Sequence, residues 1–175
     1  MSAAPAPQAA SLMVATPLYA GAAADYLRSI IGLVGAAERA GLGCRFAWLS
    51  NNAVIDRARN ALVAAFLESE ARYLVFIDGD IGFDPDQLIG LIARMEADPA
   101  LAVVGAPCPK RRINWNLVAA AAERGLAAGN PAALERFSGV FALDLVDPKG
   151  QFRLDQPIEL TRIGTGLMAI RREVI

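Results

Sequence analysis

The sequence predicts an α/β protein with a mostly parallel central sheet flanked by helices. Short runs of apolar and β-branched residues alternate along the chain with longer stretches that repeat apolar residues at helical spacing. The run Tyr73–Ile77 is apolar throughout, as in a strand that is buried on both faces of a parallel sheet. Several such runs lead directly into polar loops, which is where open α/β sheets bind ligands.

The composition narrows the class of protein further. Of the 175 residues, 55% are hydrophobic and 20% are charged, which suits a folded chain with a sizeable core. The net charge of −1 provides no field to recruit nucleic acid, so we expect no nucleic-acid partner. Histidine is absent, which excludes Ser-His and Cys-His nucleophile pairs and imidazole zinc sites. No apolar run approaches the roughly 20 residues that span a bilayer, so we expect no transmembrane segment.

We expect a disordered Ala/Pro tail over residues 1–10 and a single domain over 11–175. The tail lacks the basic start and the apolar run of a signal peptide. Cys44 and Cys108 lie far apart without metal-type spacing, which favours free thiols in a reducing cytoplasm, although their pairing stays open. The chain ends on what resembles the first turn of a helix, so we expect a domain truncated at its C-terminus.

The first half of the chain predicts three strands, each followed by a helix. Apolar runs predict strands at 11–16, 44–49 and 73–77, and helical periodicity predicts helices at 22–40, 54–69 and 85–97. Pro17 is expected to halt the first strand, and Tyr26 to pack in the core. Gly41 suits a left-handed stop to the first helix. Asp84 is a good N-cap for the third helix, with Pro85 at its first position.

The second half of the chain is less regular. A buried strand is expected at 101–105, followed by an Ala-rich helix over 116–126 and a short helix that begins at Pro131. Alternating residues at 138–146 and 151–154 flank a turn at 147–150 and predict a β-hairpin. Two more strands are expected at 158–163 and 167–170.

Asp78 and Asp80 are the strongest candidates for chemistry. They follow the central apolar strand and are separated by Gly79, which allows the backbone to bend sharply. Two carboxylates this close repel each other unless a cation lies beside them, and Mg²⁺ or Mn²⁺ completed by water and substrate phosphate is the natural partner. The alternative is structural: Asp80 is solvated and Asp78 caps a local turn.

Two sets of cations are candidates for binding phosphate. Arg59 lies in the first half of its helix, where a cation opposes the macrodipole, and an arginine aimed into the crevice there could meet a phosphate. Lys110 opens a run of three cations in a loop that two prolines keep extended, on the expected ligand side of the sheet. A solvated surface position is the alternative for both. Trp115, just beyond, either covers a sugar or base or is half-buried.

The order of these features resembles the nucleotide-sugar-binding core of a GT-A glycosyltransferase of the family 2 kind, a Rossmann-like α/β fold. The matching segments cover most of residues 11–175: Thr16-Pro17, Asp56 to Asn60, Tyr73 to Asp80 with its Asp-X-Asp motif, Phe83-Asp84-Pro85, and Gly164 to Arg172. Each motif alone is short and of low specificity, so the resemblance depends on their order and spacing.

The resemblance implies a role for each matching position. A base and ribose pocket would be lined by Thr16, Pro17 and Tyr19. The nucleotide would lie beside Asp56, Arg59, Asp78 and Gly79, with electrostatic help from Lys110. The divalent cation would be held directly by Asp80, with Asp78 approaching the metal or the ribose. The donor sugar and the acceptor would be bordered by Gly164, Thr165 and Gly166.

The implied reaction is transfer of a sugar from a nucleotide-sugar to a hydroxyl of a glycan, lipid or protein acceptor, dependent on Mn²⁺ or Mg²⁺. In the family, a catalytic carboxylate follows the glycine loop and a further metal ligand comes later still. This chain stops before either position, so the catalytic residue is unassigned. A non-catalytic nucleotide-sugar-binding module or a truncated transferase fragment therefore stays open. A HAD-type phosphohydrolase is less favoured, because Gly82 stands where that family has Thr or Val. A cytoplasmic location is expected, with attachment at the membrane periphery left open.

Overall fold

The computed structural model describes residues 10–19, 21–147 and 156–175. The chain divides into two units, which we describe separately: Met1–Ala106 with Thr165–Ile175, and Pro107–Gly164. Except for Ala10, the predicted Ala/Pro tail lies outside the described residues. The single domain expected over 11–175 stays a prediction.

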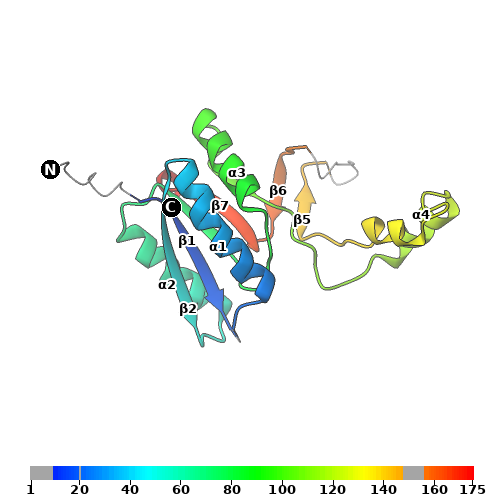
Figure 1. Ribbon diagram of the computed structural model, residues 1–175, viewed down its shortest axis with the longest axis horizontal. Helices are drawn as coiled ribbons and strands as arrows, with labels where there is room; N and C mark the ends of the chain where they lie inside the picture. Colours follow the sequence, from blue (N-terminus) through cyan, green and yellow to red (C-terminus); the bar gives the residue numbers. More distant parts are fainter. Residues whose placement is uncertain (1–9, 20, 148–155) are drawn as a thin grey trace. The chain divides into compact units, whose positions relative to one another are not determined.

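The first unit contains a mixed five-stranded sheet in the order β2-β1-β3-β7-β4 (Figure 1). Its strands are β1 (Ala10–Leu18), β2 (Gly43–Ser50), β3 (Tyr73–Ile77), β4 (Val103–Gly105) and β7 (Leu167–Arg171). β1 pairs in parallel with both β2 and β3, whereas β7 runs antiparallel between β3 and β4. The predicted α/β class with a flanked central sheet is confirmed, and the sheet is consistent with a Rossmann-like fold.

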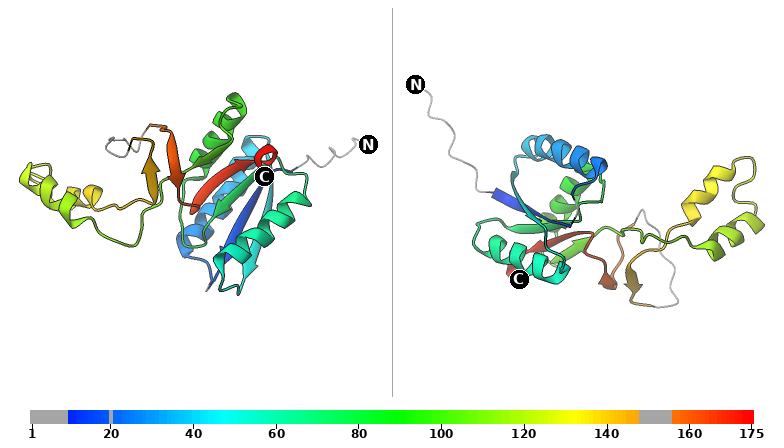
Figure 2. Two further views of the ribbon diagram at one scale, coloured as in Figure 1. Left: turned by 180° about the vertical axis from the view of Figure 1, so that it is seen from behind. Right: turned by 90° about the horizontal axis from the view of Figure 1, so that it is seen from below.

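Helices cover both faces of this sheet. They are α1 (Ala24–Arg39), α2 (Ile55–Leu67) and α3 (Pro85–Ala97), and a 3₁₀ turn, η2 (Arg172–Val174), follows β7. α1 and α3 lie on one face and α2 lies on the other (Figure 2). The side chain of Ser29 in α1 joins the two helices of the first face, because it donates to the carbonyl of Phe83 (2.6 Å) and accepts from the amide of Phe83 (2.9 Å), just before α3.

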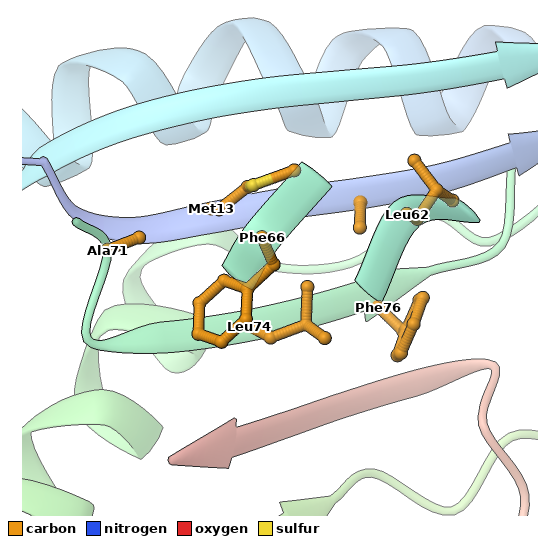
Figure 3. Close-up of a cluster of buried hydrophobic side chains, with 7 residues drawn as sticks. Met13, Leu62, Phe66, Ala71, Leu74 and Phe76 are labelled. Atoms are coloured by element: carbon orange, nitrogen blue, oxygen red, sulfur yellow. The ribbon is translucent and has the colours of Figure 1, made fainter. Parts of the chain in front are cut away.

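The core on the α2 face shows how strand alternation sorts the side chains. A buried apolar cluster joins β1, β3 and α2 (Figure 3): Met13, Ala15, Leu62, Phe66, Ala71, Leu74 and Phe76. Successive residues of a strand point to opposite faces, so Thr16 points toward α1. Asp78, which continues the alternation of Leu74 and Phe76, comes out on the α2 face.

Both predicted ends of helices are confirmed. The side chain of Asp84 accepts hydrogen bonds from the amides of Asp86 (2.9 Å) and Gln87 (3.4 Å), and Pro85 begins α3. Gly41, after α1, adopts a φ of 67°, the left-handed conformation that glycine tolerates best.

Two predicted boundaries in the sheet are wrong. β1 does not stop at Pro17 but continues to Leu18, because beyond Ala15 it pairs with β2 alone and proline is tolerated where one side lacks a partner. The strand predicted to be buried at 101–105 is β4, a three-residue strand at the end of the sheet with Val103 50% exposed. An apolar run does not distinguish an edge strand from a central one.

The second unit holds α4 (Trp115–Glu123), the 3₁₀ helix η1 (Pro131–Phe137), β5 (Leu143–Leu145) and β6 (Leu160–Ile163). The strand predicted at 138–146 is reduced to β5, which pairs antiparallel with β6. The predicted strand at 151–154, and the predicted turn from residue 148 onward, lie outside the described residues. Within the ranges that the structure describes, no helix has both the length and the apolar character needed to cross a membrane.

Candidate functional site

The candidate site is centred on Asp78, the first residue after β3. Its amide donates to the carbonyl of Gly166 (2.9 Å), just before β7, and its own carbonyl accepts from the amide of Ile81 (3.0 Å). The backbone is therefore held both by the neighbouring strand and by its own turn. This arrangement fixes where the carboxylate emerges at the carboxyl end of the parallel strands, the edge at which open α/β sheets bind ligands.

Arg59 of α2 forms an ion pair with this carboxylate. Its Nη2 donates to Asp78 Oδ1 at 2.9 Å, and the two side chains are only 21% and 31% exposed. The Nε of Arg59 is buried and has no hydrogen-bond acceptor among the described residues. Buried donors normally have a partner, so this guanidinium has an unused donor next to Asp78.

The charge on Asp78 is only partly compensated. Burial raises the pKa of its carboxyl group above the ordinary value, the positive charge of Arg59 and its hydrogen bond lower that pKa, and the negative charge of Asp80 raises it again. The net direction is upward. A bound cation would act in the opposite direction, since it would favour the ionised form.

Gly79 is favoured by close packing rather than by a left-handed backbone. A Cβ at this position would collide with the side chain of Leu18 at the end of β1. The carbonyl of Gly79 also accepts from the amide of Ala23 (2.8 Å), just before α1. The turn that carries the two aspartates therefore lies directly against the loop after β1.

The end of β1 contains a chain of three polar groups. Thr16 is fully buried, and its Oγ1 lies 2.7 Å from the hydroxyl of Tyr26 in α1. Trp48 of β2 donates its Nε1–H to the same hydroxyl at 2.9 Å. Thr16 and Trp48 also face each other across the β1–β2 pairing. Of the neighbouring predicted residues, Pro17 is half-buried and Tyr19 is 73% exposed.

The structure joins some of the predicted site residues directly and leaves others apart. Asp78, Arg59 and Gly166 are linked by hydrogen bonds, and Gly79 continues the same turn. Asp80 follows as an exposed residue, Asp56 is exposed in the first turn of α2, and Thr165 is half-buried.

Two predicted residues belong to the second unit. The amide of Lys110 donates to the carbonyl of Val140 (2.6 Å), and the amide of Gly164 donates to the carbonyl of Ala142 (2.7 Å). Both residues are therefore anchored by backbone hydrogen bonds within their own unit.

Sequence reasoning missed two residues of the site region. Tyr26 was expected only in the core, and Trp48 was not singled out. The signal that could have found them is the alternation of Phe46 and Trp48 on one face of a strand, opposite Thr16. Using that signal requires the register between β1 and β2, which one sequence does not supply.

The donor set fits a hard divalent cation. Among the described residues, no group of three or more His, Cys, Asp or Glu side chains is placed to hold a metal. Asp78 and Asp80 offer only carboxylate oxygens, which suits Mg²⁺ or Mn²⁺ that keeps water and substrate oxygens as its other ligands. A tetrahedral zinc site would need nitrogen or sulfur ligands instead.

Together, these observations describe an α/β protein with a mixed five-stranded sheet, consistent with a Rossmann-like fold, and with two aspartates in the turn after β3. No protein-family model matches the chain, and no curated protein matches it either.

Proposed function

We propose that this chain is the nucleotide-sugar-binding core of a metal-dependent glycosyltransferase. The observation that carries the proposal is the half-buried carboxylate of Asp78 at the carboxyl end of β3, paired with Arg59 at 2.9 Å and followed two residues later by Asp80. This arrangement supports the proposal because it places two kinds of group side by side. The partly compensated carboxylate could bind a cation, and the guanidinium could bind a diphosphate.

Asp78 and Asp80 would hold Mn²⁺ or Mg²⁺ in this proposal. The bound cation would offset the negative charge that develops on the departing nucleoside diphosphate. The protein's own part is to hold the two carboxylates in place through the hydrogen bond from Asp78 to Gly166 and the packing of Gly79.

Arg59 would position both Asp78 and the nucleotide. Its Nη2 orients the carboxylate, while the exposed part of the guanidinium side chain, 21% of its surface, would meet a phosphate oxygen. Planar guanidinium groups bind phosphate through several parallel hydrogen bonds, which lysine does not reproduce. Substitution of Arg59 should therefore weaken binding of a diphosphate even where lysine preserves the charge.

The remaining assignments come from the resemblance. Thr16, Pro17 and Tyr19 would line the pocket for base and ribose, with the buried Thr16 acting through the Tyr26 hydroxyl rather than by open contact. Thr165 and Gly166 would border the donor sugar and the acceptor. Gly164 and Lys110 belong to the second unit, so their roles stay predictions from the resemblance alone, and the catalytic base stays unassigned.

Isothermal titration calorimetry tests the proposal. UDP and GDP are titrated into the protein with Mn²⁺ and, separately, with EDTA, and we expect binding that requires the metal. Asp80→Asn should abolish the metal-dependent binding of both nucleotides and leave the far-UV circular dichroism spectrum unchanged. Absence of Mn²⁺-dependent binding of both nucleotides to a folded wild-type protein would reject the proposal. Binding without transfer to any acceptor would favour the non-catalytic module.

A further inference from the structure

Trp48 is an exposed aromatic residue with a fixed orientation. Its ring stacks on that of Phe46, with centroids 5.6 Å apart and planes inclined by 7°, and its Nε1 donates to the hydroxyl of Tyr26 at 2.9 Å. Despite these two contacts, 51% of the residue is exposed. Because the stacking and the hydrogen bond already hold the indole in place, a ligand that covers it would cost it little further conformational freedom.

The open face of the indole points toward the carboxyl end of the sheet. Phe46 precedes Trp48 by two residues on the same face of β2, so its ring covers the side of the indole that faces the start of the strand. The next residue on the same face of the strand is Ser50, a small exposed residue at the end of β2, which leaves the opposite side of the indole open. Asn51 then adopts a φ of 60°, a left-handed conformation, as the chain leaves the strand.

This position suits one end of a nucleotide whose other end lies at Asp78. β1 lies between β2 and β3, so two strand spacings, about 10 Å, separate the ends of β2 and β3. Asp78 comes out on the α2 face and Trp48 on the α1 face, so a nucleotide would have to cross the end of the sheet, with its diphosphate at Asp78, its ribose over the end of β1 and its base at Trp48. Bases stack on aromatic side chains with little regard to sequence, since every base has a π-face.

We propose that Trp48 is the platform on which the nucleobase stacks. The inference rests on the proposed nucleotide-sugar function and assigns a base-binding residue to it. Phe46 supports the covered face of the indole, and Tyr26 anchors its N–H. The two are positioning residues, because they act through Trp48 rather than on the base.

Tryptophan fluorescence gives a direct test, because Trp48 and Trp115 are the only two tryptophans in the sequence. In a Trp115→Phe variant the signal comes from Trp48 alone. With Mn²⁺ present, we expect UDP and GDP to quench this fluorescence and inorganic pyrophosphate, which has no base, to leave it unchanged. Equal quenching by pyrophosphate, or no quenching by a nucleotide that calorimetry shows to bind, would overturn the inference.

Calorimetry on Trp48→Leu provides the second readout. We expect UDP and GDP affinity to fall about tenfold, with pyrophosphate affinity unchanged and Trp48→Phe intermediate. Tyr26→Phe removes the anchor and keeps the indole, so it should reduce nucleotide affinity less than Trp48→Leu and serves as the readout if Trp48→Leu does not fold. Unchanged nucleotide affinity in folded Trp48→Leu overturns only the stacking role, whereas wild-type protein that binds neither UDP nor GDP overturns the proposed function as well.

Discussion

The carboxyl group of Asp78 shows how one residue can be held in an unfavourable electrostatic position. Burial and the negative charge of Asp80 raise its pKa, and the pairing with Arg59 offsets only part of that increase. Groups perturbed in this way by burial together with a specific partner gather at functional sites. Residues in ordinary structural ion pairs, by contrast, usually have carboxyl groups with lowered pKa values.

The raised pKa has a consequence for stability. An acid whose pKa is higher in the folded state binds more protons there than in the unfolded state, so its contribution to stability falls as pH rises through the interval between the two values. We expect the unfolding free energy of the wild type, minus that of Asp78→Asn, to decrease from the ordinary aspartate pKa upward. Urea unfolding of both proteins at a series of pH values measures this difference.

The subtraction removes titrating groups that the two proteins share. Asp80→Asn is the matched control: it should lower the pKa of Asp78 and so reduce the pH dependence of the same difference when it is added to both proteins. A difference that increases with pH would mean that the Arg59 pairing outweighs burial.

The close packing of Gly79 against Leu18 leads to a second prediction about a single residue. Gly79→Ala should cost about 1 kcal/mol, because the new methyl group must displace the flexible end of Leu18. Combining Gly79→Ala with Leu18→Ala should cost less than the sum of the two single changes, since the collision is then removed. Chemical denaturation of the four proteins measures this coupling.

Gly90 in α3 is the matched control for Gly79. A Cβ there meets nothing within 4 Å, so Gly90→Ala should stabilise the protein by about 1 kcal/mol through helix propensity. Additive costs for Gly79 and Leu18 would contradict the packing explanation.

Among the elements, α2 depends on a residue from the far end of the chain. The guanidinium of Arg172 donates to the carbonyls of Phe66 (2.8 Å), Ser69 (2.6 Å) and Ala71 (2.8 Å) and lies over the ring of Phe66 at 4.4 Å. A cation at a helix C-terminus also complements the macrodipole. α2 carries Arg59, so this contact supports the candidate site at a distance.

We therefore expect Arg172→Ala to lower the unfolding free energy by about 3 kcal/mol, because hydrogen bonds from a charged donor to part-buried carbonyls are lost. Arg172→Lys should recover only part of the loss, since an ammonium cannot reach all three acceptors in the same geometry. Arg57→Ala, an exposed position on α2, should change stability by less than about 0.5 kcal/mol. Equal effects of the alanine changes at 172 and 57 would contradict the role of Arg172.

The elements that the sequence predicted well are those defined by local chemistry. The start of α3 could be predicted because Asp84 and Pro85 act on adjacent backbone groups, and the stop at Gly41 because it needs only one left-handed residue. β3 could be predicted from its uniform apolar run. Pro17 and β4 could not, because their outcome depends on which neighbours a strand has, and this is decided elsewhere in the chain.

The same distinction applies to the candidate site. Asp78, Asp80 and Arg59 were candidates from the local sequence pattern. The contact of Asp78 with Arg59, between the end of a strand and a helix, could not be predicted from sequence spacing. Trp48 and its link to Tyr26 and Thr16 became visible only through the register of β1 and β2.

At the scale of the whole molecule, the decisive feature is that β7, the last strand in the sequence, lies between β3 and β4 in the sheet. It pairs with both β3 and β4, and its Leu167, Met168 and Ala169 are buried. The sheet of the first unit is therefore complete only when residues on both sides of Pro107–Gly164 come together. The amide of Ala106 donates to the carbonyl of Leu167 (3.0 Å), so the two ends of the intervening segment lie next to each other.

This arrangement predicts that the first unit folds without the second. Replacement of residues 107–164 by a short Asn-Gly linker would join β4 to β7 as an ordinary antiparallel hairpin. We expect this variant to unfold cooperatively in a circular dichroism melt and to give dispersed amide resonances. A second variant that ends at Ala106 lacks β7 and leaves the buried edge of β3 unpaired, so it should not fold. A linked variant with molten, non-cooperative behaviour would mean that the sheet needs contacts from Pro107–Gly164, and equal folding of both variants would mean that β7 is dispensable.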